Sequence, residues 1–364
     1  MSLTPNNTAD YAAQLAVNVQ QFKESFAPFA LPEPLVHASA PQNYRLRAEF
    51  RMWHQGAQVF YAMFDPARPK HPVIIDEFAA ADTAISALMP RLRAAIEAAP
   101  VLKEALFQIN FLATLSGEKM ATLIYHRRLD ADWEVAARAL AKEEGVQIVG
   151  RSRKQKIVLE RDWLLESFEL GGRTLRYQQR EGAFTQPNGG VNRQMLAWAC
   201  QQTRGLGSDL LELYCGNGNF TIALAPYFER VLATEMSHSS VQAARYNLTE
   251  NAVDNVFLAR MSSDEISAAL SGGRLFNRLQ EADLTRYRFS TLFVDPPRSG
   301  LDAATLSLAA RFDHILYISC QRESLLDNVT ALFTTHTISA SAVFDQFPYT
   351  PHLECGLLLS RRKT

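Results

Sequence analysis

Hydrophobic residues repeat with two different periods in the first half of the chain. Over residues 9–26 they recur every three or four positions, which predicts an amphipathic helix. Over residues 44–52 they alternate with mainly basic side chains, which predicts a half-buried strand with a basic outer face. The remaining patterns predict helices at residues 81–99, where Pro90 favours a kink, and 132–142, and strands at residues 59–64, 72–76, 107–115, 120–126 and 147–159.

The second half has a different pattern, in which helices alternate with short apolar strands. This alternation is typical of a doubly wound α/β domain with a Rossmann-like sheet. We therefore predict an N-terminal α+β domain over residues 1–180 and a C-terminal α/β domain over residues 181–364. The strands of the second half are predicted at residues 209–214, 230–233, 291–294, 314–318, 342–344 and 355–359.

Composition narrows the class of protein without identifying it. The chain has 364 residues, of which 47% are hydrophobic and 21% charged, as in an ordinary globular protein. It has no apolar stretch long enough to cross a bilayer and no secretion signal, so we expect a cytoplasmic protein. Its formal net charge is −1, so affinity for nucleic acid has to come from local clusters. The four cysteines form no C-x-x-C pair, which argues against a metal or iron–sulfur site.

A glycine-rich turn follows the first strand of the second half. Two acidic residues end later strands: Glu235, which lies 19 positions after Gly216, and Asp295. Open α/β sheets bind ligands at the carboxyl ends of their strands, so these segments are expected to meet in one crevice. The turn lacks the full G-x-G-x-x-G pattern that cradles a pyrophosphate, which favours S-adenosylmethionine over a dinucleotide. Its sequence is Cys215-Gly216-Asn217-Gly218-Asn219.

The turn after Asp295 is stiffened by Pro296 and Pro297, which directly follow the acidic residue. Similar motifs occur in methyltransferases that act on planar nitrogen heterocycles, where the rigid turn positions a base beside the methyl donor. Arg298 follows the prolines and has the chemistry to pair with a phosphate or to orient a carbonyl.

Cys320 and Glu354 are the candidates for covalent chemistry. Cys320 ends the next strand and is therefore expected to face the same crevice as Asp295. Glu354 stands at the entrance of the final strand, where it is either an exposed edge charge or a buried general base. Cys200, in a helical stretch, and Cys355, inside the final strand, are interpreted as structural.

These segments resemble the tRNA (uracil-5-)-methyltransferase family, and the motifs occur in the family's order. In one respect the chain departs from the family, whose members usually carry Asn-Pro after the cysteine, because Gln321-Arg322 stands there and leaves the local loop geometry open. The matching segments are residues 211–220, 293–300, 352–356 and 184–188, with residues 44–51 and 106–108 in the first half.

The resemblance implies a role for each matching residue. Cys320 would be the nucleophile and Glu354 the base, and Phe107, Arg51 and Arg298 would contact RNA. It also implies methylation of uridine 54 in the tRNA T loop, with tmRNA as a further substrate, by a monomer without a metal. S-adenosylmethionine would be bound by Gln186, Tyr214, Asn219, Glu235 and Asp295.

The chemistry explains why a thiol and a carboxylate are needed together. Uracil C5 is a poor nucleophile, and attack of the Cys320 thiolate on C6 places electron density on C5. Glu354 would then remove the C5 proton, and elimination would release Cys320. A nearby cation such as Arg298 would favour the thiolate.

Three basic clusters in the first half suggest a face that contacts phosphates. They contain Arg45, Arg47 and Arg51; Arg127 and Arg128; and Arg151, Arg153, Lys154 and Lys156. Phe107, Phe111 and Tyr125 are candidate platforms for base stacking, although two of the three are expected to be core residues.

Three other functions remain open. A ribosomal-RNA uridine methyltransferase would share the chemistry, but such relatives usually carry cysteines for an iron–sulfur cluster. An amino-methyltransferase would need an aromatic residue where Arg298 stands. An RNA-folding chaperone that binds and opens tRNA would need no thiol, and it is compatible with catalysis.

Overall fold

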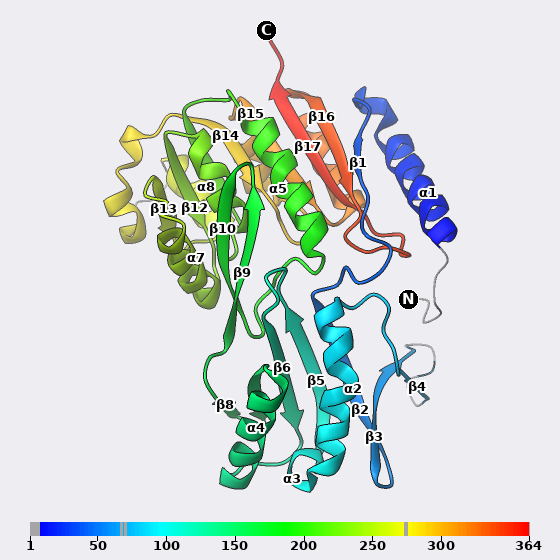
Figure 1. The fold of residues 1–364 in the computed structure, drawn as a ribbon. Helices are drawn as coiled ribbons and strands as arrows, with labels where there is room; N and C mark the ends of the chain where they lie inside the picture. The colour runs from blue at the N-terminus through cyan, green and yellow to red at the C-terminus, as the bar shows by residue number, and fades with distance from the viewer. Residues whose placement is uncertain (1–7, 66–67, 69–70, 273–275, 364) are drawn as a thin grey trace. The chain divides into compact units, whose positions relative to one another are not determined.

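A computed structural model describes residues 8–65, 68, 71–272 and 276–363 of the protein (Figure 1). The described chain forms two compact units. The first contains the residues up to Ser39, Glu169–Tyr177 and the residues from Gly190 onward, and the second contains Ala40–Phe168 and Gln178–Gly189. The start of the chain, where we expect no secretion signal, lies outside the described residues up to position 7.

This division differs from the predicted single boundary after residue 180. Strand β1 (Leu35–His37) pairs in parallel with β16 (His336–Phe344), so the N-terminal segment joins the sheet of the C-terminal half. Helix α1 (Thr8–Phe26) confirms the predicted helix, and its Phe22 and Phe26 are buried in the core of the same unit. Pairing between residues about 300 positions apart leaves no trace in local hydrophobic spacing.

The first unit is built on an eight-stranded sheet, which confirms the doubly wound α/β class (Figure 1). Its order is β1-β16-β17-β15-β14-β11-β12-β13, and the strands from β15 to β13 are parallel. Strand β17 runs antiparallel to both of its neighbours. The other strands are β11 (Asp209–Leu213), β12 (Arg230–Thr234), β13 (Val256–Ala259), β14 (Phe289–Val294), β15 (His314–Ser319) and β17 (Glu354–Arg361).

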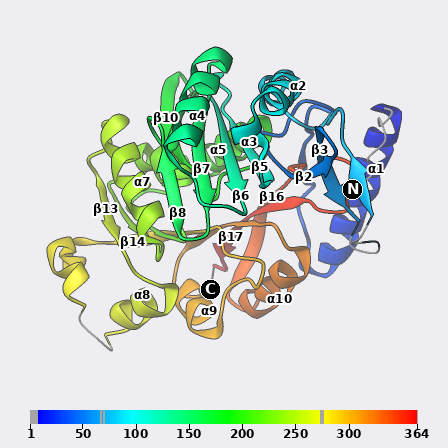
Figure 2. The same ribbon diagram turned by 90° about the horizontal axis from the view of Figure 1, so that it is seen from below.

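Helices cover both faces of this sheet, as burial of parallel strands requires. On one face, α8 (Ser263–Leu270), α9 (Ala303–Ala309) and α10 (Arg322–Leu332) lie together (Figure 2) and share a core with α1. On the other, Trp198 of α5 (Gly189–Thr203) packs edge-on against Phe344, with ring centroids 5.7 Å apart. Two further helices, α6 (Asn219–Leu224) and α7 (His238–Glu250), follow β11 and β12.

The second unit contains a seven-stranded sheet of order β4-β3-β2-β5-β6-β7-β8, which confirms the predicted α+β character. Helices α2 (Thr83–Ala98), α3 (Pro100–Lys103) and α4 (Ala131–Glu144) bury apolar residues in its core. Helix α2 continues through Pro90, which is exposed, so the expected kink does not divide it. The strands are β2 (Arg47–Gln55), β3 (Gln58–Phe64), β4 (Pro72–Ile74), β5 (Leu106–Ala113), β6 (Lys119–Tyr125), β7 (Gln147–Ser152) and β8 (Gln155–Val158).

One predicted strand is wrong, because residues 147–159 form the hairpin of β7 and β8. Arg153 and Lys154 make its turn, and Lys154 adopts a left-handed conformation with φ 60°. Neither residue has a strong turn propensity, so the residue pattern contains no signal that divides the strand. The remaining strands, β9 (Trp163–Leu170) and β10 (Arg173–Arg180), form a two-stranded sheet.

Candidate active site

The strand order brings the predicted chemical groups to one edge of the first unit's sheet. Glu235, Asp295 and Cys320 directly follow the parallel strands β12, β14 and β15. Because β17 is antiparallel, its first residue, Glu354, lies at that same edge. Ser319 of β15 is paired with Cys355 of β17. Cys320 follows Ser319 and Glu354 precedes Cys355, so these two residues lie next to the same strand pair.

The glycine-rich turn after β11 is held by backbone hydrogen bonds to the neighbouring strand end. Cys215 N donates to Thr234 O at 3.0 Å, and Gly216 N donates to Glu235 Oε2 at 3.1 Å. The other oxygen of Glu235 accepts from Ser237 N at 2.7 Å. The Glu235 carboxylate is therefore fixed in direction and keeps lone pairs for further donors.

Asn219 and Asp295 lie in contrasting surroundings. The side chain of Asn219 is hydrogen bonded in both directions to Asn192, at 2.9 and 3.1 Å. Asp295 is partly exposed, and desolvation nevertheless raises its pKa to about 7. Burial also raises the pKa of Tyr214, which has φ 60°. The turn after β11 therefore carries the amide and the phenol, and the carboxyl group of Asp295 follows the neighbouring strand β14.

Cys320 is the most accessible of the four cysteines. Cys200, Cys215 and Cys355 are buried, which confirms the structural interpretation of Cys200 and Cys355, whereas Cys320 is partly exposed. Burial raises the pKa of the Cys320 thiol, and the charges of Glu354 and Asp295 act in the same direction. Arg298 lowers this pKa, as predicted, but it does not outweigh the other groups.

Glu354 is a buried carboxyl group, which resolves the alternative that it is an exposed edge charge. Glu354 is only 6% exposed. Burial raises its pKa to about 8, with a further increase from Asp295 and a decrease from Arg298. A carboxyl with a pKa near neutrality is suited to accept and release a proton under physiological conditions.

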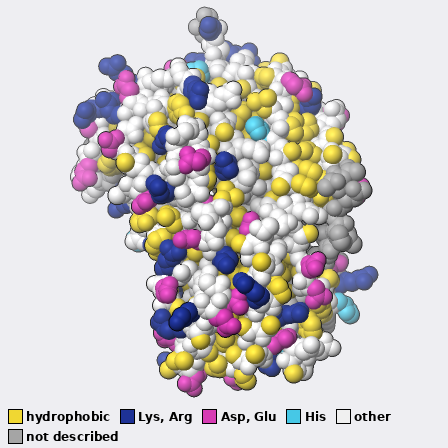
Figure 3. All heavy atoms as spheres, in the orientation of Figure 1, with side chains coloured by type: hydrophobic (Ala, Val, Ile, Leu, Met, Phe, Trp, Pro, Cys, Tyr) yellow, Lys and Arg dark blue, Asp and Glu magenta, His cyan; other side chains and the backbone are white. Residues whose placement is uncertain are grey.

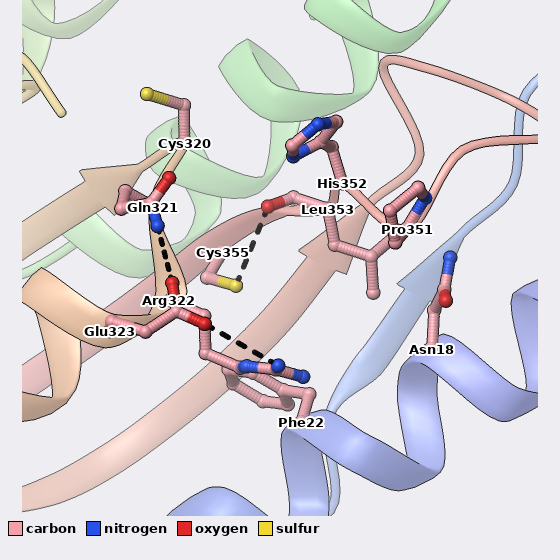
Figure 4. Close-up of a pocket in the computed structure, with 10 residues that line it drawn as sticks. All are labelled: Asn18, Phe22, Cys320, Gln321, Arg322, Glu323, Pro351, His352, Leu353 and Cys355. Atoms are coloured by element: carbon pink, nitrogen blue, oxygen red, sulfur yellow. Dashed lines mark hydrogen bonds and ion pairs between the residues drawn. The ribbon is translucent and has the colours of Figure 1, made fainter. Parts of the chain in front are cut away.

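The Gln321-Arg322 pair leaves the strand, turn and helix in place. Gln321 N donates to Ser319 Oγ at 3.2 Å, and α10 begins at Arg322. Arg322 lies 3.5 Å from Glu323 and contributes to a cavity of about 180 Å³ that also reaches Phe22 (Figure 4). The sulfur of Cys320 points away from Arg322 and from Cys355 (Figure 4), so the replaced pair does not cover the thiol.

Gln186, Arg51 and Phe107 belong to the second unit. There the guanidinium of Arg51 lies 3.9 Å from the centre of the Phe107 ring, and Phe107 stacks on His126 at 3.9 Å. Phe111 and Tyr125 are buried, which confirms that two of the three candidate platforms are core residues. His126 was not identified from the sequence. This residue directly follows β6, the strand that pairs with the strand of Phe107, and the order of the two predicted strands could have indicated it.

The basic clusters are not equally free to meet a phosphate. Arg151 pairs with Glu181 at 2.5 Å, and Lys156 pairs with Asp162 at 2.8 Å. Arg45, Arg47 and Arg51 alternate with buried residues, as on the predicted strand face. However, Arg45 is largely desolvated, which lowers its pKa, and the Arg47 guanidinium donates to the carbonyl of Ala183.

Three basic side chains remain available beside the Phe107–His126 stack. Arg128, Arg153 and Lys154 line a cavity of about 830 Å³ with Phe107 and His126, and none makes an ion pair with another described residue. On the face drawn in Figure 3, acidic and basic side chains are interspersed.

Known proteins match the chain along nearly its whole length. The family model described as tRNA (Uracil-5-)-methyltransferase matches residues 10–362. Proteins named tRNA/tmRNA (uracil-C(5))-methyltransferase from Aromatoleum aromaticum and Dechloromonas aromatica are 66% and 63% identical over 362 residues. The alignments cover 100% of this chain and 98% and 100% of those proteins.

A solved structure has the same fold at low sequence identity. It is the Pyrococcus abyssi tRNA (uracil-54, C5)-methyltransferase in complex with S-adenosyl-L-homocysteine. The TM-score is 0.73 at 20% identity, and the match covers 96% of this chain and 83% of that chain.

The family match and the near full-length relatives, together with the fold and the strand-end groups, define an S-adenosylmethionine-dependent methyltransferase. Within that class, the chain belongs to the tRNA (uracil-5-)-methyltransferase family. No described helix is long and apolar enough to span a membrane.

Proposed function

We propose that the enzyme methylates C5 of uridine 54 in the T loop of tRNA through a covalent bond between Cys320 and C6. The observation that carries the proposal is the joint position of Cys320, at the end of β15, and Glu354, at the start of antiparallel β17. A partly exposed thiol beside a buried carboxyl group is the pair that this reaction requires.

The chain's own residues account for the bonds that change on the uracil. Addition of the Cys320 thiolate to C6 leaves electron density on C5, the atom to be methylated. Once C5 carries the transferred methyl group, Glu354 accepts the proton that remains on C5. The electrons of that C–H bond re-form the C5–C6 double bond and expel the Cys320 thiolate.

The turn after β11 fits S-adenosylmethionine, which supplies an electrophilic methyl group when bound. Apart from Gly216 and its two chain neighbours, no heavy atom of the described residues lies within 4 Å of the point where a Cβ on Gly216 would be, so a ligand can approach the backbone there. We assign Gln186, Tyr214, Asn219, Glu235 and Asp295 to this cofactor. The carboxyl groups of Glu235 and Asp295 suit its hydroxyl and cationic groups.

For the RNA, we assign base and phosphate contacts to separate groups. His126 and Arg51 cover the ring of Phe107 and are themselves exposed, so we assign the platform for a base to the stack of these three side chains. Arg298 would contact the nucleotide that enters the site, since its charge acts on both Cys320 and Glu354. The target uridine has to leave its stack to reach Cys320, so we propose that it is flipped out of the T loop.

We extend the substrate proposal to tmRNA, because the relatives at 66% and 63% identity carry both RNAs in their names. We further propose that the enzyme acts in the cytoplasm as a monomer on the T arm. An assay of both RNAs with the same preparation tests this extension, and activity on tRNA alone would remove tmRNA.

The direct test of the mechanism uses tRNA that contains 5-fluorouracil in place of uracil. Fluorine cannot leave as a cation, so the adduct with Cys320 should persist through denaturing electrophoresis when S-adenosylmethionine is present. Cys320→Ser should form no adduct, whereas Cys200→Ser, a change at a buried thiol, should form it normally. An adduct of undiminished yield in the Cys320 variant would overturn the proposal.

A further inference from the structure

We propose that Asn192 is a positioning residue of the cofactor site and acts by holding the side chain of Asn219. The inference rests on the proposed contact between Asn219 and S-adenosylmethionine. Asn192 lies on α5 and Asn219 is the first residue of α6, 27 positions later. The two amides form a reciprocal pair, in which Asn192 Nδ2 donates to Asn219 Oδ1 at 3.1 Å and Asn219 Nδ2 donates to Asn192 Oδ1 at 2.9 Å.

The chemistry of this pair determines what Asn219 can offer a ligand. A carboxamide has two N–H donors and an oxygen with two lone pairs. The reciprocal pair uses one donor and one lone pair of each residue, so Asn219 keeps one of each for another partner. The pair also fixes the plane of the amide, because rotation of Asn219 alone would break both bonds. Asn219 is therefore presented with a defined donor and a defined acceptor.

Residues other than Asn192 hold the backbone of the turn. The position of this backbone therefore does not depend on the hydrogen bonds that hold the Asn219 side chain. Tyr177 Oη donates to the carbonyl of Asn219 at 3.0 Å, and Asn247 Nδ2 donates to the carbonyl of Asn217 at 2.9 Å. Tyr177 is 1% exposed, and Asn192 itself is 7% exposed. Loss of the Asn192 amide should therefore free the side chain of Asn219 while the turn stays in place.

A double-mutant cycle on cofactor affinity tests this inference. Binding of S-adenosylmethionine to the full-length protein is measured by calorimetry for Asn192→Ala, Asn219→Ala and the double variant. We expect each single variant to weaken binding by about tenfold, as for loss of one net hydrogen bond. If Asn192 acts through Asn219, the double variant should be no weaker than Asn219→Ala. Additive effects, or wild-type affinity in Asn192→Ala, would overturn the inference.

The isosteric variant Asn192→Asp covers the case in which Asn192→Ala does not fold. Its ionised carboxylate has no donor for Asn219 Oδ1, so binding should weaken by a similar factor while the volume of the side chain is kept. At saturating S-adenosylmethionine, both variants should recover the wild-type yield of the fluorouracil adduct. A yield that stays low at saturation would mean that Asn192 supports the fold of the site generally, which contradicts a role through Asn219.

Asn255→Ala is a matched control, since Asn255 also donates through its amide, to the carbonyls of Ala225 and Phe228 at 2.9 and 3.0 Å. It should lower the melting temperature without changing cofactor affinity. Unchanged affinity in Asn219→Ala would refute the cofactor assignment itself. Weak binding by Asn219→Ala with normal binding by Asn192→Ala would refute only this inference.

Discussion

At the scale of single residues, the protonation of Glu354 should control the pH dependence of the reaction. Burial raises its pKa to about 8, and only the carboxylate can accept the C5 proton. Release of methylated tRNA from Cys320 in a single turnover should therefore rise with pH toward about 8 and fall nearly tenfold per unit below it. The raised pKa of Cys320 acts in the same direction, because the thiolate is the nucleophile. A flat profile below neutrality would contradict this role.

Glu354→Gln should stop the reaction after the methyl group has been transferred. Glutamine cannot accept the C5 proton, so the methylated RNA should remain bound to Cys320 and turnover should fall by about 10²–10⁴-fold. Ordinary tRNA with labelled S-adenosylmethionine should then give a labelled protein–RNA band on a denaturing gel. A variant that releases methylated tRNA at the wild-type rate would exclude Glu354 as the base.

The same substitution should stabilise the folded protein at alkaline pH. The pKa of the Glu354 carboxyl is 4.5 in the unfolded chain and about 8 in the folded protein, so between these values only the unfolded state releases its proton. Wild type therefore loses stability as pH rises through this window, and Glu354→Gln does not. The difference in melting temperature should grow from about pH 5 to about pH 8, by roughly 2–4 °C for each kcal/mol. A difference independent of pH would contradict the assigned burial.

Site residues that follow a strand could be predicted from the sequence. Residues whose role depends on a side-chain contact with a distant part of the chain could not. Cys320, Asp295 and Glu235 follow predicted strands, so the doubly wound pattern with the family motifs was enough to bring them together. The pairing of Asn192 with Asn219 depends on how α5 packs against the turn after β11, which no local pattern encodes. The neutralisation of Arg151 by Glu181 was hidden for the same reason.

At the scale of elements, the hairpin of β7 and β8 should provide the main phosphate contacts. Its turn carries Arg153 and Lys154, which make no ion pair with other described residues and line a cavity beside Phe107. Replacement of both by glutamine should weaken tRNA binding and reduce the slope of log affinity against log salt by about 1–2.

The control for this prediction is Arg138→Gln on α4. Arg138 carries the same charge but is paired with Glu134 at 2.6 Å, so the salt slope should stay near that of wild type. The hairpin variant removes two charges and this control removes one. Equal losses of affinity per charge removed would show that net charge, and not the hairpin, determines affinity.

Strands and helices with a clear period were predicted well, and failures occurred where a break had no sequence signal. Helix α1 and strand β3 lie within a residue of their predicted bounds, because their apolar spacing reflects one buried face. The pattern predicts one strand where β7 and β8 form a hairpin, because the turn between them lacks glycine, asparagine and proline. Pro90 failed to divide α2, whose buried residues, such as Leu88 and Leu92, lie on both sides of it.

At the scale of the whole molecule, chain order and compact units do not coincide. The N-terminal segment belongs to the methyltransferase unit because β1 extends its sheet and α1 fills its core. A domain boundary drawn from the change of pattern near residue 180 would cut this unit into two pieces. The two hydrophobic cores have separate members, so each unit has its own source of stability.

This division predicts which unfolding transition each core substitution affects. Phe26 of α1 is fully buried in the first core and Leu92 of α2 in the second, so Phe26→Ala and Leu92→Ala should each cost about 2–5 kcal/mol in their own unit. S-adenosylmethionine should stabilise mainly the first unit, which holds all of its assigned residues except Gln186. In calorimetry, Phe26→Ala should therefore lower the melting temperature of the transition that the cofactor raises, although α1 precedes the cofactor turn by almost 200 residues. Leu92→Ala should lower the melting temperature of the other transition. If the cofactor raised the transition lowered by Leu92→Ala and left the one lowered by Phe26→Ala unchanged, α1 would not belong to the methyltransferase unit.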